Sequence, residues 1–228
     1  MSISTISLKR PVSSYSKVQN LVGNLRRNRK FQLSSKNLAT KSYLDLGCGP
    51  NIHDDFVNVD YMWRPGIDLC WDIRKGLPFQ DGTFDGIFSE HCLEHFPLET
   101  GLEILREAKR LLKAGGRLRI VIPDAEIYLR VYVDRLNGIS ESKFPFEAKE
   151  QESTYYSALS SVNRIYYQDR ESLFGHRCMY DFALLSKLLD SLGFHEIEKL
   201  AFRQGRDEKL LIDEPSRAIE SLYVEARA

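Results

Sequence analysis

Residues 44–50 read Leu-Asp-Leu-Gly-Cys-Gly-Pro, a short apolar run that stops at a glycine turn. This pattern predicts a buried strand followed by a loop, and glycines let the backbone of such a loop approach a ligand closely. A dinucleotide-binding fingerprint would need a third glycine where Ile52 stands and an acid about 20 residues further on. The next acid at a strand end, Asp60, follows Gly47 by only 13 residues, so NAD binding is disfavoured.

Apolar runs and periodic patterns around this loop predict an α/β fold. Strand patterns occupy 43–46, 56–60, 67–72, 84–89, 117–123, 195–200 and 222–227, and helical stripes occupy 98–113 and 182–192. Glycines at 115–116 and at 193 are expected to end the two helices. Residues 203–218 carry no helical stripe, whereas a parallel strand needs a helical crossover. We therefore predict a doubly wound, seven-stranded, mostly parallel sheet with an antiparallel last strand.

The composition is that of a globular domain. The chain has 228 residues, of which 43% are hydrophobic and 28% are charged. These values exclude a disordered, collagen-like or coiled-coil chain, and no apolar run approaches the roughly 20 residues of a membrane-spanning helix. Cysteines occur at four scattered positions without a Cys-x-x-Cys pair, which disfavours a disulfide scaffold or a zinc ribbon and suits a reducing compartment.

Charge is unevenly distributed along the chain. Residues 1–41, the N-terminal arm, hold nine basic residues and no acid, which leaves a net charge of −9 on residues 42–228. Apolar residues at helical spacing, among them Val18, Leu21 and Leu25, predict a short amphipathic helix in the arm. This helix could pack on the body, dock on an anionic membrane surface or belong to a serine-rich organelle transit peptide. We expect a cytoplasmic protein, peripheral at a membrane if the arm docks there, and we do not expect nucleic acid as a partner.

Several motifs follow the glycine loop in a fixed order. Asp60 ends the second predicted strand, Asp72-Ile73 ends the third, residues 76–85 contain Pro-Phe followed by Phe-Asp, and residues 90–95 read Glu-His-Cys-Leu-Glu-His. Over residues 45–122 this order resembles the class I S-adenosylmethionine-dependent methyltransferases, and the small type 11 family in particular. The resemblance implies a Rossmann-like methyltransferase fold and S-adenosylmethionine as the cofactor.

The resemblance also implies roles for the residues that match these motifs. Those expected to bind the cofactor are Asp45, Gly47, Cys48, Gly49, Asp60, Tyr61, Asp72, Ile73, Ser89 and Glu90. The loop would contact the methionine part of the cofactor, Asp60 would accept both ribose hydroxyls, and Asp72 would accept the adenine amino group. Asp45 could equally brace the loop. Ser89 and Glu90 would lie beside the sulfonium.

Removing a proton from an acceptor hydroxyl or amine requires a base, and three residues are candidates. His91 is the first, His176 the second and Asp124 the third, although each could instead position the acceptor. Residues 124–178 form an insertion rich in tyrosine and phenylalanine, which suits a lid or a substrate wall. We predict methyl transfer to an oxygen or nitrogen atom of a small-molecule or glycan-type acceptor.

The sequence differs from the family in one respect, and it also allows two alternative functions. Only nine residues separate Leu46 from Phe56, too few for a full helical crossover, so the first helix should be shortened or lost. Residues 91–95 also match His-x-x-Glu-His, which on a helix could hold zinc through His91 and His95 for hydrolysis. The other alternative is a regulatory module that binds the cofactor without turnover. We favour the methyltransferase and assign no metal ligand.

Overall fold

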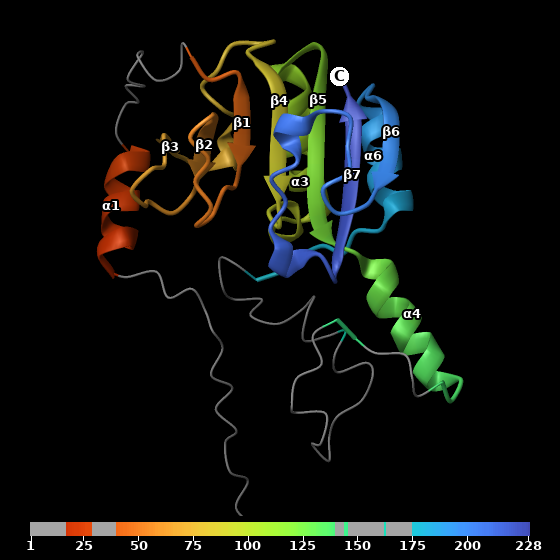
Figure 1. Ribbon diagram of the computed structural model, residues 1–228. Coiled ribbons are helices and arrows are strands. Elements are labelled where there is room, and N and C mark those ends of the chain that lie inside the picture. Colours follow the sequence, from red (N-terminus) through yellow and green to blue (C-terminus); the bar gives the residue numbers. More distant parts are fainter. Residues whose placement is uncertain (1–16, 29–39, 140–143, 146–161, 163–174) are drawn as a thin grey trace, which may run out of the picture.

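The computed structural model describes residues 17–28, 40–139, 144–145, 162 and 175–228 (Figure 1). Its strands are β1 (Tyr43–Leu46), β2 (Phe56–Asp60), β3 (Leu69–Cys70), β4 (Phe84–Glu90), β5 (Leu112–Pro123), β6 (His195–Leu200) and β7 (Ser221–Arg227). Its α-helices are α1 (Lys17–Asn28), α3 (Leu98–Leu111), α4 (Ala125–Leu136) and α6 (Phe182–Ser191). Single 3-10 turns are η1 (Ile73–Lys75), η2 (Leu93–His95), η4 (Glu208–Leu210) and η5 (Pro215–Arg217).

The seven strands form one sheet in the order β3-β2-β1-β4-β5-β7-β6. Strand β1 lies in the middle of the parallel part, where Leu44 pairs with Val57 on one side and with Ile87 on the other. Strand β7 is antiparallel to both β5 and β6. The link before β7 contains only the short turns η4 and η5, so the chain reverses direction instead of crossing over the sheet. The predicted mostly parallel sheet with an antiparallel last strand is confirmed.

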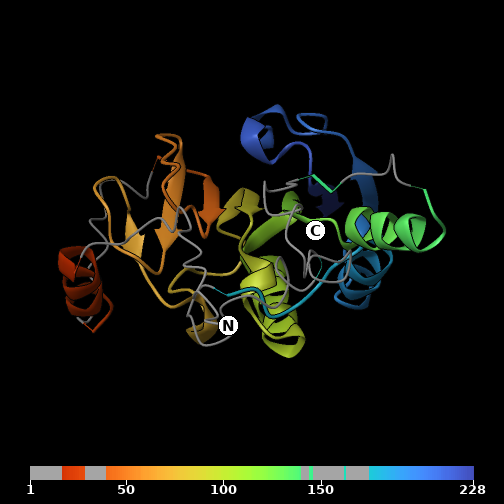
Figure 2. The same cartoon turned by 90° about the horizontal axis from the view of Figure 1, so that it is seen from below.

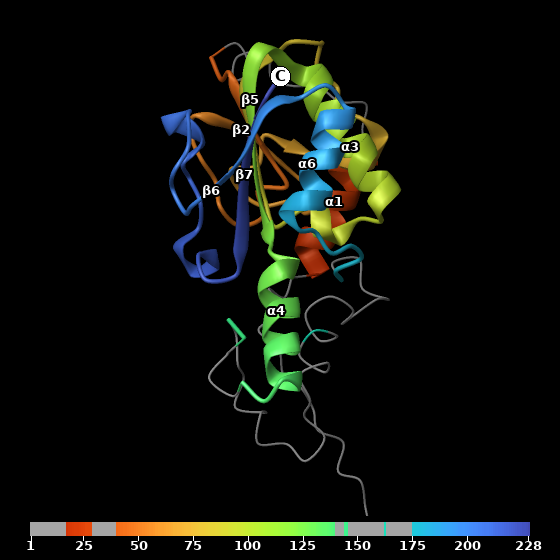
Figure 3. The ribbon, with the colours of Figure 1, turned by 90° about the vertical axis from the view of Figure 1, so that its right-hand side faces the viewer.

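The two faces of the sheet are covered differently (Figure 3). Helices α3 and α6 lie on one face, where Leu105 and Leu185 are buried in the main hydrophobic cluster. On the opposite face the link that contains η4 supplies Leu210, which packs with Phe56 and Phe88. No helix lies between β1 and β2, as the short spacing predicts. Loss of that helix leaves room for the link before β7 to cover the sheet.

Three element boundaries differ from the sequence-based prediction. Strand β3 spans only Leu69–Cys70, within the predicted 67–72. Helix α3 ends at Leu111, before the glycine pair that was expected to stop it. That pair joins β5 because Gly115 donates to the carbonyl of Ala228, and Ala228 donates back to Gly116, at 3.0 and 2.8 Å. Pairing with the C-terminus therefore draws the glycines into the sheet.

The carboxyl ends of β4 and β5 lie at the lower edge in Figure 1, where α4 continues from β5. Figure 2 looks onto this edge from below. Helix α4 is the described start of the predicted 124–178 insertion, and its Tyr128 stacks on Phe144 with ring centroids 6.0 Å apart. Most other aromatic residues of the insertion lie outside the described residues, so its role as a lid or wall stays a prediction.

Helix α1 lies in the N-terminal arm, and it contacts the body through an unexpected face. Gly23 is buried, with its carbonyl near the Cys70 thiol, and the Arg27 guanidinium lies 3.7 Å from the Tyr61 ring centroid. The apolar residues that suggested packing, Val18 and Leu21, are instead more than 60% exposed. None of the described helices combines the length and apolar character that crossing a bilayer requires.

Candidate active site

The glycine loop after β1 has a conformation that demands glycine at its first position. Gly47 has a φ of +80°, in the left-handed region, and a Cβ there would lie 2.9 Å from the Cβ of Cys92. Cys92 follows β4, so the loop is pressed against the chain that leaves the neighbouring strand. Any larger residue at position 47 would push these two segments apart.

Backbone hydrogen bonds tie the glycine loop to β2. The amides of Gly47 and Cys48 both donate to the carbonyl of Val59, at 2.9 and 3.1 Å. The amide of Gly49 donates to Oδ2 of Asp60 at 2.9 Å. Because these three amides are already engaged, the groups that the loop can offer to a ligand are carbonyl oxygens. Carbonyl oxygens accept hydrogen bonds and suit a ligand's ammonium group.

Asp60 holds the loop and keeps capacity for a ligand. Its Oδ1 accepts from the amide of Met62 at 2.7 Å, while Oδ2 accepts from Gly49. A carboxylate offers about four lone-pair sites, so two remain for further donors. Burial raises the pKa of Asp60, and the two amide bonds and the nearby Arg64 and Arg27 oppose that rise.

Asp45 lies close to Asp60 and to a third carboxyl group, that of Glu90. Asp45 is buried, and its pKa stands well above its ordinary value because of burial and because of the charges of Glu90 and Asp60. The pKa of Glu90 is also raised, mainly by burial, while its Oε1 accepts from the amide of Glu214 at 3.0 Å. Three clustered carboxyl groups repel one another, and a positively charged ligand would relieve that repulsion.

The residues expected around adenine lie at the ends of β2 and β3, with their polar groups engaged in the protein. Asp72 caps η1 and forms a bidentate ion pair with Arg74, with N–O distances of 2.7 and 2.8 Å. This pair lowers the pKa of Asp72. Ile73 is buried behind it. The ring of Tyr61 faces the guanidinium of Arg27.

Ser89 and His91 lie at the end of β4. The Ser89 hydroxyl donates to the carbonyl of Leu46 at 3.0 Å and joins the ends of β1 and β4. His91 has a φ of +46°, which is uncommon for a residue other than glycine and is typical of functional sites. Its Nε2 lies 2.9 Å from the Ser221 hydroxyl, and its Nδ1 lies 3.2 Å from Arg217 Nη1 and 3.3 Å from Glu94 Oε1. Its neighbours are thus compatible with either ring tautomer.

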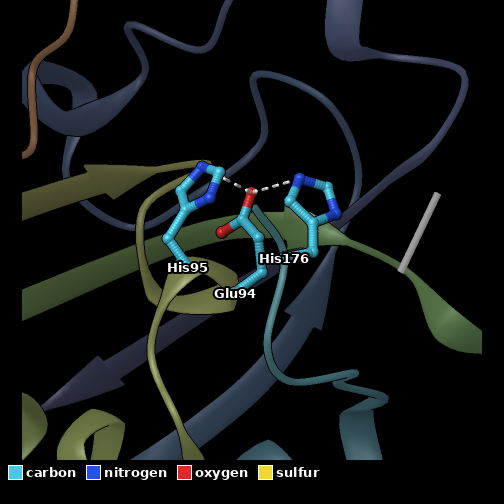
Figure 4. A group of neighbouring side chains, drawn as sticks. All are labelled: Glu94, His95 and His176. Carbon is cyan, nitrogen blue, oxygen red and sulfur yellow. Dashed lines mark ion pairs between the residues drawn. The ribbon is translucent and has the colours of Figure 1, made fainter. Parts of the chain in front are cut away.

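Glu94, His95 and His176 form a compact group beside His91 (Figure 4). Glu94 Oε1 lies 4.0 Å from Nε2 of His95 and 4.0 Å from Nε2 of His176. Burial alone would raise the pKa of Glu94, but the three facing imidazoles lower it to about 2. Burial lowers the pKa of His176 to about 4.

Asp124, the third candidate base, directly precedes α4. Its side chain caps α4 by accepting from the amide of Glu126 at 3.0 Å, and its Oδ2 lies 3.2 Å from Nζ of Lys199. These contacts join the start of α4 to β6. Among the predicted bases, His91 and His176 therefore lie together, while Asp124 is engaged as a helix cap.

Several residues around the site were not predicted from the sequence. Arg217, in the segment before β7, and Ser221, the first residue of β7, both approach His91. Arg27 approaches Tyr61 from α1. No motif or spacing indicates these contacts, because they join segments more than 30 residues apart. The sequence does show that a long link precedes β7 and that an arm precedes β1, but not which residues of these segments reach the site.

The sequence from β2 into β5 matches a known family. Residues 57–120 match the type 11 methyltransferase domain. The chain carries a methyltransferase domain of this type. Enzymes of this class transfer a methyl group from S-adenosylmethionine, which is the cofactor of this methyltransferase. The matched segment contains Asp60, Asp72 and the 90–95 motif, so these parts of the site lie within the family's own domain.

Several solved structures are distantly similar to the chain. One from Archaeoglobus fulgidus is 15% identical, with a TM-score of 0.45, over 92% of this methyltransferase and 94% of that chain. A possible histamine N-methyltransferase from Thermotoga maritima is 16% identical, with a TM-score of 0.47, over 84% and 87%. The Burkholderia thailandensis 1,6-didemethyltoxoflavin-N1-methyltransferase, solved with S-adenosylhomocysteine, is 14% identical, with a TM-score of 0.46, over 96% and 81%. No curated protein sequence matches the chain.

The structure does not show the helix that the zinc-hydrolase alternative requires. Residues 91–95 form a strand end followed by the 3-10 turn η2, not an α-helix. His91 and His95 therefore do not share a helical face, which a His-x-x-Glu-His zinc site requires.

Proposed function

We propose that this methyltransferase transfers the methyl group of S-adenosylmethionine to an oxygen or nitrogen atom of a small-molecule or glycan-type acceptor. The observation that carries the proposal is the arrangement at the carboxyl ends of β1, β2 and β4. There the glycine loop offers carbonyl oxygens, Asp60 retains free lone pairs, and the carboxyl groups of Asp45 and Glu90 lie near each other.

The cofactor's charges suit this arrangement. S-adenosylmethionine has a positive sulfonium and an ammonium group, and both would be attracted to Asp45 and Glu90. The ribose hydroxyls would donate to Asp60, with Gly47, Cys48 and Gly49 around the methionine part and Ser89 near the sulfonium. The methyl group is already activated on the cofactor, so the main task of the protein is to align the acceptor with it.

The adenine end of the cofactor would require a local rearrangement. For Asp72 to accept the adenine amino group, at least one of its oxygens must exchange Arg74 for the ligand. The exposed guanidinium of Arg74 can turn into solvent at little cost, since ion pairs of this kind contribute about 0–1 kcal/mol. Ile73 and Tyr61 would then flank the base.

We propose His91 as the group that takes a proton from the acceptor. In the tautomer with a proton on Nδ1, Glu94 orients the ring and Nε2 is an acceptor that now faces Ser221. A base held by a carboxylate is the arrangement used for activated nucleophiles in many enzymes. An acceptor hydroxyl or amine would replace Ser221 as the partner of Nε2. His176 is the second candidate, and the contacts of Asp124 suit it least.

Titration calorimetry of the full chain with S-adenosylmethionine and S-adenosylhomocysteine tests the cofactor roles. Saturable one-site binding is expected. Transfer of labelled methyl groups to panels of amines, alcohols and oligosaccharides then tests the acceptor class. Label recovered only on thiols or on carbon atoms would overturn the proposed oxygen or nitrogen acceptor.

We also propose that the arm docks on an anionic membrane surface, which would make a cytoplasmic protein peripheral. The exposed Val18, Leu21 and Leu25 share one face of α1, and the arm carries nine basic residues without an acid. Vesicle flotation should recover the chain with anionic but not with neutral phospholipid. Leu21→Asp should abolish recovery, while Asn20→Asp, which adds the same charge at an exposed position, should reduce it much less.

A further inference from the structure

We propose that Glu94, His95 and His176 form a binding site for a divalent transition-metal ion, with Zn²⁺ as the ion that suits them best. One ligand atom from each residue lies within 4.8 Å of the other two. The two imidazoles approach the same carboxylate from either side, as Figure 4 shows. Metal binding is a property separate from methyl transfer, so the proposal does not depend on the acceptor or on the role of His91.

The strongest evidence is the environment of Glu94. Its side chain is only 1% exposed, its Oε2 has no hydrogen-bond partner among the described residues, and its Oε1 faces the imidazoles of His91, His95 and His176 at 3.3–4.0 Å. A buried carboxylate with so few close partners is unfavourable unless a positive charge compensates it. The unpartnered Nδ1 of His95, also buried, adds a second polar atom that the described protein does not satisfy.

The geometry needs only a small contraction to hold a metal. Zinc binds imidazole nitrogen and carboxylate oxygen at about 2.0–2.2 Å, so neighbouring ligand atoms in a tetrahedral site lie about 3.3 Å apart. The two oxygen–nitrogen distances here are each 4.0 Å. All three ligand atoms lie within 4.8 Å of one another, so side-chain rotations that bring each pair closer by about 0.7–1.5 Å would close the site.

The backbone keeps the two contributing segments together. Glu94 and His95 lie on η2, and the carbonyl of Glu94 accepts from the amides of Arg177 and Cys178, at 2.7 and 3.2 Å. These bonds hold His176 opposite His95, and the two rings meet edge to face with centroids 5.0 Å apart. The ligands are therefore positioned by the fold before any ion binds.

The donor set indicates which ion would bind. Two imidazoles and one carboxylate form a known zinc-binding set in which a further position stays open for water or another ligand. His91 Nδ1, 3.3 Å from Glu94 Oε1, is placed to support the carboxylate as an outer partner. Calcium and magnesium prefer oxygen ligands and suit this set poorly.

The test uses the full chain, first stripped with a chelator, and Zn²⁺ and Co²⁺ as probes. Competition against a chromophoric chelator should give one zinc site per chain. Glu94→Gln, His95→Gln and His176→Gln should each weaken zinc binding by more than about 100-fold, beyond the effect typical of outer partners. His195→Gln, at an exposed histidine on β6, should leave the affinity unchanged.

Two measurements on the unaltered chain guard against variants that fail to fold. Zinc should raise the melting temperature, and a chelator should reverse the rise. X-ray absorption of the zinc-loaded chain should count two imidazole ligands. No saturable binding, an affinity that all three variants retain, or a spectrum with fewer than two imidazoles would each overturn the metal site. The Glu94 group would then be a buried polar contact that joins η2 to His176.

Discussion

Residues 45–74 form one half of the candidate active site from a single stretch of chain, whereas the other half draws on residues between Ser89 and Ser221. In the first half, Asp60 lies 11 residues from the Gly49 amide that it accepts. In the second half, His91 and Ser221 are 130 residues apart. Short links restrict where the partners can lie, while distant partners depend on how the whole sheet is assembled. The predictions below test whether the near half binds the cofactor and the distant half performs the chemistry.

The largest expected effect is that of Asp60→Ala on cofactor binding. Hydrogen bonds to a charged group contribute about 1.5–3 kcal/mol each, so losing both ribose contacts should weaken affinity by at least about 100-fold. Titration calorimetry measures this loss. Asp55→Ala removes an exposed carboxylate from the neighbouring link and should leave the affinity within about twofold. Equal affinities for the two variants would contradict the ribose role of Asp60.

His91→Asn should separate chemistry from binding. Asparagine tolerates a positive φ, so the backbone at position 91 need not change. Turnover should fall by about 10²–10⁴-fold while cofactor affinity stays unchanged, because a general base contributes in that range. A loss of cofactor binding as large as that of Asp60→Ala would mean that the two halves of the site are not distinct. His195→Asn serves as the control for a histidine outside the site.

Gly47→Ala tests how tightly the near half is packed. The variant should be about 1–3 kcal/mol less stable than Gly193→Ala, measured by chemical denaturation, because of overpacking against Cys92. Gly193 has nearly the same φ, +79°, but a Cβ there meets nothing within 4 Å. The two variants therefore share the backbone strain and differ in the contact. Equal losses would show that the loop and Cys92 move apart freely.

Arg74→Ala should have the smallest effect, and its sign is informative. If Arg74 competes with adenine for Asp72, removing it should strengthen cofactor binding by up to about fivefold, within the range of an exposed ion pair. Lys75→Ala removes a neighbouring exposed charge and should change the affinity less. A weaker affinity in Arg74→Ala would mean that Arg74 holds Asp72 in its binding position.

Much of the near half and of the sheet could be predicted from the sequence. The run 43–46 before two glycines indicates β1 and its loop because apolar strands and positive-φ glycines have strong local signatures. The spacing between Leu46 and Phe56 also predicts the missing first helix, since nine residues cannot form a crossover. The antiparallel β7 follows from the same argument about links.

The distant half could be predicted only as a set of separate residue types. His91 and His176 were expected near the acceptor, but the sequence does not indicate that His176 faces Glu94, or that Arg217 and Ser221 face His91. The local pattern 91–95 even suggests a helical zinc motif, which the 3-10 turn η2 replaces.

Local chemistry was thus determined by the sequence itself: which segments become strands, where glycine must turn, and which acids end the strands. The tertiary structure decided which distant side chains share a site. Hydrophobic periodicity and backbone conformation act within a few residues, so they can be read along the chain. The contact between Glu94 and His176 depends on the order of the strands in the sheet. It also depends on the main-chain hydrogen bonds from Arg177 and Cys178 to Glu94, which join segments far apart in the sequence.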